Sequence, residues 1–136
     1  MIRKDSLLFE IEKLAQVLAK IIGLKKEGKV KESHDLVNNA LVDYFALNED
    51  RLDSISTDEM SALLKEKNFP TEKLNYLANL VFERAHPFED TPEHINRLHV
   101  VLLLFNILER DHRTQSLDNL AKREMIDHFL NNQQYE

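Results

Sequence analysis

Apolar residues recur at alternating steps of four and three positions along the first part of this 136-residue chain, beginning with Leu7, Ile11, Leu14, Leu18 and Ile21. Such steps place side chains on one face of an α-helix, whereas the side chains of a strand alternate every two residues. Only two glycines and three prolines are present, which leaves little material for the turns of a β protein. We therefore expect an all-α fold of about six helices in helix-turn-helix hairpins.

The first helix has a second apolar stripe, formed by Leu8, Ala15 and Ile22, beside the first. An apolar face this wide favours two neighbouring elements rather than one. Phe9 falls among polar residues and is a candidate interface anchor, unless it packs under the C-terminal helix. We expect a two-fold homodimer through this helix; the alternative is a monomer in which the hairpin partner and the last helix cover the whole face.

A small basic segment follows the first helical pattern and contains Lys25, Lys26, Lys29 and Lys31. Lysines are favoured near a helix C-terminus because they complement its dipole, so a solvated helix end is the simplest interpretation. The alternative is a site for an anion or a partner, and the four lysines are kept as candidate interaction residues. Gly28 is expected to end the helix in the left-handed conformation, whereas Gly23 predicts a close helix approach or early fraying.

Helix start and stop signals organise the rest of the chain. A capping box at Ser56 and Glu59, the pair Thr91 and Pro92, and Ser116 each predict the start of a helix. We expect a single helical domain over residues 1–136, with an N-terminal hairpin (4–47), a polar connector (48–57) and C-terminal helices (58–132). The last helix should pack through its apolar positions, Leu117, Leu120, Ala121, Met125, Phe129 and Leu130.

The segment VVLLLF, residues 100–105, is apolar on every side of its helix. It is far shorter than the roughly 20 apolar residues that cross a bilayer. Such a segment is typical of a helix buried among several others, so the helix to Arg110 is predicted to be the hub of the fold.

The hairpin turn EGKVKESHDLVNNAL resembles the helix-turn-helix of tetratricopeptide repeats, whose turn and packing positions are matched by Gly28, Val30, Ser33, Val37 and Ala40. The stretch LAKIIGLKKEGKVKESHDLVNNAL is also similar to the start of a family of small bacterial helical proteins of unknown function. The resemblance implies a tetratricopeptide-like right-handed bundle built from a degenerate repeat, and it implies no catalytic residues. The chain departs from the repeat at Ile21, where a small residue is usual, and no second copy follows at a period of about 34 residues.

No residue pattern predicts a catalytic, cofactor or metal site. The chain has no cysteine, and Ser33, His34 and Asp35 are consecutive, so a helix points them about 100° apart and they cannot form a triad. An EF-hand loop after Asp50 is excluded because Leu52 replaces a ligand. His94 and His99 are five residues apart, which is the wrong helical spacing for a pair of metal ligands. Glu124 and His128 are four residues apart, which is a suitable spacing, but they supply only two ligands. We therefore interpret them as a surface pair.

Two hypotheses for function remain. The leading one is a noncatalytic protein-interaction or scaffold module in the cytoplasm, with no cofactor and an unidentified protein partner. The net charge of −6 argues against nucleic acid, and no membrane span is expected. The alternative is a small-molecule-binding protein or hydrolase with a pocket near residues 85–94, formed by His86, Glu89, Asp90 and His94. A deep pocket holding two of these residues would favour it, and a shallow groove would favour the first hypothesis.

Overall fold

The computed structural model describes the backbone of residues 2–134 and the side chains of residues 6–132. Within these residues the chain forms helices and no strand, which confirms the predicted all-α fold. Residues 2–134 form seven helices, which fits the expected number of about six: α1 (Ile2–Lys26), α2 (Val30–Phe45), α3 (Glu49–Ser54), α4 (Thr57–Lys67), α5 (Thr71–Ala85), α6 (Pro92–Arg110) and α7 (Leu117–Gln134).

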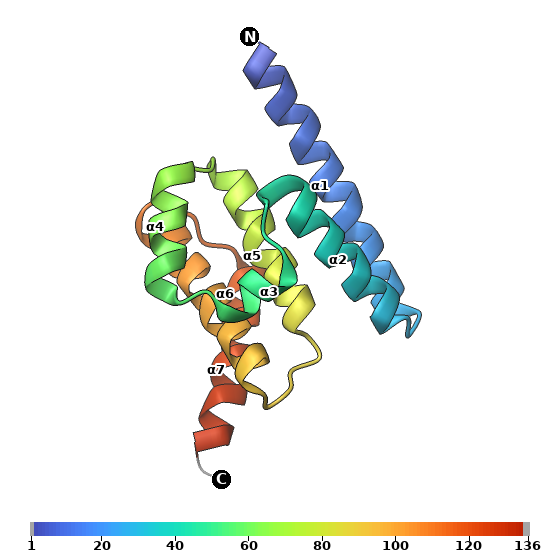
Figure 1. Ribbon diagram of the computed structural model, residues 1–136, viewed down its shortest axis with the longest axis vertical. Coiled ribbons are helices and arrows are strands. Elements are labelled where there is room, and N and C mark those ends of the chain that lie inside the picture. The colour runs from blue at the N-terminus through green and yellow to red at the C-terminus, as the bar shows by residue number, and fades with distance from the viewer. Residues whose placement is uncertain (1, 135–136) are drawn as a thin grey trace.

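The helices are arranged around α5 and α6, which pack on each other in the middle of the molecule. Figure 1 shows α1 and α2 on one side of this pair and α4 on the other, and the N-terminal turns of α1 extend beyond the end of α2. Helix α5 contacts α1, α2 and α6, whereas α6 contacts α3, α4, α5 and α7. The predicted hub helix therefore does occupy the centre of the fold.

The two glycines of the first hairpin behave differently. Gly28 has φ of +79°, the left-handed conformation that was predicted for it, and it follows the last turn of α1. Gly23 was predicted to mark a close approach or a frayed end, and this was wrong. It is exposed inside α1, the helix continues to Lys26, and an added Cβ would meet no atom within 4 Å.

The polar connector contains a short helix that periodicity did not reveal. In α3 the side chain of Asn48 accepts a hydrogen bond from the backbone N–H of Arg51 at 2.8 Å, which caps the helix. Leu52 and Ile55 are buried at 0% and 3% exposure. Six residues make fewer than two turns, so a repeat of 3.6 residues cannot be recognised over such a length.

The other helix boundaries follow the predicted capping signals. Ser56 and Glu59 form a complete capping box at α4, and the side chain of Thr91 caps α6 with Pro92 in its first turn. The hydroxyl of Ser116 accepts a hydrogen bond from the N–H of Asn119 at 3.0 Å at the start of α7.

The core is formed mainly by the facing sides of α5 and α6. Val100, Val101, Leu104 and Phe105 are buried, as expected for the apolar hub segment. Leu102 and Leu103 are only half-buried. The apolar face predicted for α7 is partly wrong: Leu117 is 86% exposed and Met125 44% exposed, and Ala121 is also exposed, because α7 packs through the side that carries Ile126.

Candidate functional site

A groove of about 360 Å³ lies between α1 and α7, over the C-terminal half of α5. We call it the α1–α7 groove. Lys25 and Lys26 of the basic segment line it together with His86 of the predicted alternative pocket, although His86 is 61 residues away from Lys25 in the sequence. The lining residues are Ile22, Lys25 and Lys26 of α1, Phe82, Glu83 and His86 at the end of α5, and Asp118, Lys122 and Met125 of α7.

The apolar part of the groove consists of Ile22, Met125 and Phe82. Ile22 on α1 is 37% exposed and Met125 on α7 is 44% exposed, whereas Phe82 on α5 is buried at 4% exposure. The two walls therefore present apolar side chains to solvent above an aromatic floor. Partly exposed apolar side chains that converge from separate helices are typical of a groove that binds another helix.

Charged side chains surround this apolar surface. The ammonium group of Lys122 lies 2.9 Å from the carboxylate of Asp118 and 5.2 Å from the centroid of the Phe82 ring. Lys26 is exposed and forms no ion pair with any side chain that the structure describes. Lys26 is thus a cation at the rim that is available to a ligand.

Lys25, by contrast, is held inside the fold. Its ammonium group donates hydrogen bonds to the backbone carbonyl oxygens of Glu83 and His86, both at 2.7 Å, and lies 2.9 Å from the Glu83 carboxylate. Burial lowers the pKa of Lys25, while Glu83 acts in the opposite direction. A cation at this position satisfies carbonyl groups at the C-terminus of α5 that lack helical partners. The solvated helix end predicted for the basic segment is therefore wrong for Lys25.

His86 belongs to an aromatic cluster. Its ring stacks on Phe82, with centroids 5.7 Å apart, and meets the edge of Phe88 at 5.3 Å. Phe88 in turn contacts Phe129 of α7 at 5.3 Å. Burial lowers the pKa of His86, and the charge of Lys25 acts in the same direction. The loop between α5 and α6 thus anchors α7 through aromatic contacts.

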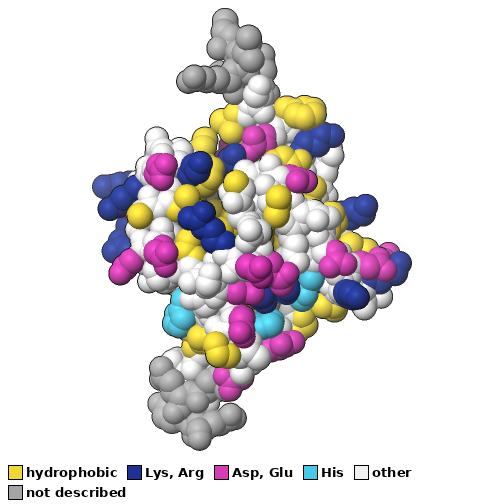
Figure 2. All heavy atoms as spheres, in the orientation of Figure 1, with side chains coloured by type: hydrophobic (Ala, Val, Ile, Leu, Met, Phe, Trp, Pro, Cys, Tyr) yellow, Lys and Arg dark blue, Asp and Glu magenta, His cyan; other side chains and the backbone are white. Residues whose placement is uncertain are grey.

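A second group of polar residues, which we call the polar network, joins α2, α3, α5 and α6. Figure 2 shows acidic, basic and histidine side chains gathered on the face that carries α3. Arg84 of α5 donates to Asn38 at 3.0 Å and also pairs with Glu49 of α3. Arg97 of α6 is 3% exposed and donates two hydrogen bonds to Asp53, at 2.6 and 2.9 Å. The short helix α3 is therefore held by arginines from both central helices.

Two histidines of the polar network accept hydrogen bonds from these arginines. Arg84 lies 3.3 Å from Nδ1 of His34, whose Nε2 lies 2.8 Å from the carbonyl oxygen of His86. A guanidinium only donates and a carbonyl only accepts, so His34 is neutral with its proton on Nε2. Burial lowers the pKa of His34, and the charges of Arg84 and Lys25 lower it further.

His94 repeats this arrangement within α6. Arg97 lies 3.3 Å from its Nε2, and its Nδ1 lies 2.9 Å from the hydroxyl of Thr91. Burial and then the charge of Arg97 lower the pKa of His94. Both imidazoles are thus neutral side chains that the fold uses as acceptors for arginine.

The structure separates the residues of the predicted alternative pocket. His94 lies 3.7 Å from the carboxylate of Glu89, which is 62% exposed. Asp90 is exposed in the same loop. His86 instead lines the α1–α7 groove. Only Glu89 and His94 are therefore brought into contact with each other.

The remaining candidate interaction residues are solvent-exposed. Phe9 is 61% exposed and does not pack under α7; the ammonium of Lys13 lies 5.1 Å from its ring centroid. Lys29 pairs with Glu27 at 3.6 Å, and both side chains are more than half exposed. Lys31 is exposed as well. The solvated interpretation fits Lys29 and Lys31.

The part of the chain that the structure describes lacks two kinds of feature. Between residues 6 and 132 no three His, Cys, Asp or Glu side chains are arranged to hold a metal ion. None of the helices between residues 2 and 134 has the length and apolar character that crossing a membrane requires. Ser33, the serine of the consecutive Ser-His-Asp sequence, is buried and donates its hydroxyl proton to the Val30 carbonyl at 2.6 Å.

Sequence reasoning missed the residues that build the polar network and the α7 wall of the groove. Glu49 and Asp53 were interpreted as parts of a polar connector, although their spacing of four is that of one helix face. Helical spacing predicts a buried face that includes Met125, whereas its side chain is 44% exposed. No sequence pattern indicates that Arg84 and Arg97 bind α3, because the Arg84–Glu49 and Arg97–Asp53 contacts join residues 35 and 44 positions apart.

Comparison of the chain with protein-family models, with curated proteins and with solved structures found no match.

Proposed function

We propose that this protein is a noncatalytic protein-interaction module whose α1–α7 groove binds an amphipathic helix of a partner. One observation carries the proposal: Ile22 and Met125 project from two separate helices into the same groove and remain 37% and 44% exposed. An amphipathic helix binds such grooves by inserting apolar side chains at spacings of three and four. Phe82, which is 4% exposed, lines the same groove between these two side chains.

The charges of the groove favour an acidic partner helix. Three lysines and two acidic residues line it, and Lys26 forms no ion pair with a described side chain. Lys25 and Lys122 are already paired, so Lys26 is the cation best placed to meet a carboxylate on the partner. Complementary charges at a rim mainly increase the rate of association and select the partner.

A second copy of the chain is proposed as a further partner, bound at the other end of α1. Leu8 and Phe9 lie near the start of α1 and are 55% and 61% exposed. The N-terminal turns of this helix extend beyond α2 (Figure 1). Adjacent exposed large apolar side chains on a projecting helix favour an isologous contact between two such helices. This contact lies away from Ile22, so the homodimer and the partner complex are separable by mutation.

Kinship with tetratricopeptide repeats and a cytoplasmic location are parts of the same proposal. Ser33, Val37 and Ala40, which match the packing positions of the repeat, are all buried where α2 meets its neighbours.

A chain without cysteine folds without an oxidising compartment. The acidic net charge supports protein rather than nucleic acid as the ligand.

Affinity capture with matched variants tests the proposed function. Ile22→Asp places a carboxylate on the apolar wall of the groove, where it would also repel an acidic partner. Val42→Asp is the control, because Val42 is 50% exposed on α2 and does not line the groove. We expect native lysate proteins that the wild type and Val42→Asp both retain and that Ile22→Asp loses. Equal recovery by all three proteins would contradict the role of the groove.

A further inference from the structure

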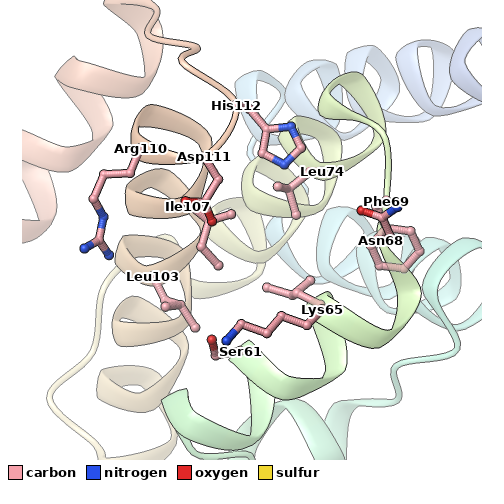
Figure 3. A pocket seen from close by; sticks show the side chains of 11 residues that line it. Ser61, Lys65, Asn68, Phe69, Leu74, Leu103, Ile107, Arg110, Asp111 and His112 are labelled. Carbon is pink, nitrogen blue, oxygen red and sulfur yellow. The ribbon is translucent and has the colours of Figure 1, made fainter.

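A larger cleft lies on the opposite side of the molecule from α1, between α4 and the C-terminal half of α6. It has a volume of about 500 Å³, within the range of pockets that hold small ligands. We call it the α4–α6 cleft. Figure 3 shows its side chains converging from α4, the start of α5, α6 and the turn after α6. The lining residues are Ser61, Leu64, Lys65, Asn68, Phe69, Leu74, Leu103, Ile107, Arg110, Asp111 and His112.

The middle of the cleft is apolar. Leu103 and Ile107 lie one turn apart on α6, and both point toward α4 and Leu74 (Figure 3). Leu74 is buried, whereas Leu103 and Ile107 are only half-buried although they belong to the hub helix. The cleft therefore exposes part of the central helix, and an apolar group placed there would remove that surface from water.

One end of the cleft carries a cation. Lys65 and Ser61 of α4 both line the cleft, and Figure 3 shows the ammonium and the hydroxyl turned toward the side that carries Leu103. Lys65 forms no ion pair with any side chain described between residues 6 and 132. Ser61 lies one turn before Lys65 on α4, so the two can donate to one acceptor group.

The other end of the cleft carries the polar side chains Arg110, Asp111 and His112, so its charge is mixed. Nδ1 of His112 lies 2.7 Å from the hydroxyl of Thr71, which fixes the ring over Leu74, and Asp111 lies beside it (Figure 3). Arg110 also lines the cleft, although its guanidinium points away from Leu103 and Ile107 in Figure 3. The carboxylate of Asp111 would repel a second negative charge on a ligand, so the cleft suits a ligand with one anionic group.

From this arrangement we propose that the α4–α6 cleft binds a small monocarboxylate with an apolar body. The carboxylate accepts from Lys65 and Ser61, and the apolar body covers Leu103, Ile107 and Leu74. The site is independent of the α1–α7 groove, with which it shares no residue, so it adds a ligand to the proposed interaction module.

Calorimetric titration of the full chain tests the proposal with three probes: octanoate, octan-1-ol and acetate. We expect octanoate to bind at least about ten-fold more tightly than octan-1-ol, because only the carboxylate forms charge-assisted hydrogen bonds. Acetate should bind more weakly than octanoate because it lacks the apolar body. Equal affinity for octanoate and octan-1-ol, or for octanoate and acetate, would overturn the proposal, as would no binding of octanoate at about 1 mM.

Two variants and one control locate the site. Lys65→Met should weaken octanoate binding about ten-fold and leave octan-1-ol within about two-fold. Lys67→Met is the control, because Lys67 is exposed on the same helix and does not line the cleft. Ile107→Glu should abolish octanoate binding, and circular dichroism would show whether it folds. If it does not fold, Lys65→Met decides alone, and an unchanged octanoate affinity in Lys65→Met would exclude this site.

Discussion

The guanidinium of Arg97 and the carboxylate of Asp53 form a two-bond pair, at 2.6 and 2.9 Å, that joins α6 to α3. Arg97 is only 3% exposed, so its charge depends on this carboxylate and on Glu49 at 3.5 Å. Because α3 has only six residues, the pair is a main attachment of that helix to the hub.

Removal of Asp53 should therefore destabilise the fold strongly. We expect Asp53→Ala to lower the free energy of unfolding by about 3 kcal/mol, because it leaves a buried guanidinium without its carboxylate. Urea denaturation measures this change. Asp43→Ala, an exposed acid on α2, should change stability by less than about 0.5 kcal/mol. Similar midpoints for the two variants would mean that the pair does not support α3.

The hub segment offers a matched pair of leucines. Leu104 is 0% exposed, whereas Leu102, two residues earlier, is half-buried. Leu104→Ala should cost about 3 kcal/mol through cavity formation, and Leu102→Ala should cost clearly less because solvent can fill the space. Chemical denaturation of both variants tests this, and the reverse order of midpoints would contradict the assigned orientation of α6.

The two glycines should respond to alanine in opposite directions. Gly23→Ala should stabilise the protein by about 1 kcal/mol, since Gly23 lies inside a helix with open space around it. Gly28→Ala should destabilise it by about 1 kcal/mol, because a Cβ strains a residue with φ of +79°. Thermal melts of both variants, each compared with the wild type, measure the difference. A change in melting temperature of the same sign in both variants would contradict either the helical position of Gly23 or the left-handed conformation of Gly28.

The neutral histidines predict a loss of stability in mild acid. Burial lowers the pKa of His34, His86 and His94 in the folded chain, so the unfolded chain binds more protons below about pH 6.5. Their contribution to stability is complete above that pH and is lost as the pH falls toward the lowered values.

Urea denaturation at pH 7.5 and pH 5, at constant ionic strength, measures this dependence. His34→Gln should reduce it, since glutamine does not titrate, and His128→Gln, at an exposed position on α7, should leave it unchanged. Stability that is constant or increases between pH 7.5 and pH 5 would contradict the neutral state assigned to these rings.

The exposed pair on α1 predicts the oligomeric state. The chain mass is 16.0 kDa, and light scattering after size exclusion should give twice this value at tens of micromolar. Leu8→Glu or Phe9→Ser should shift the protein to the monomer, whereas Val42→Glu should not. A dimer that survives both substitutions would place the contact elsewhere, and a wild-type mass of one chain would exclude the homodimer.

Local sequence signals predicted most of the helices and few of the site residues, and the reason is physical. A capping box such as Ser56 and Glu59, or a left-handed glycine such as Gly28, is decided by neighbours within a few positions. The fixed position of Lys25 depends on carbonyl groups 58 and 61 residues away, and helical periodicity carries no information about such distances. The exposure of Met125 likewise depends on how α7 lies on α5 and α6.

The dependence of α3 on distant arginines sets an order for its formation during synthesis. A six-residue helix is unstable alone, because nucleation fixes several residues for very few hydrogen bonds. The partner of Asp53 follows it by 44 residues, so α3 leaves the ribosome well before Arg97 is available. We therefore expect the first hairpin to pair as soon as α2 is made, and α3 to form only when the first turns of α6 emerge and bring Arg97 to it.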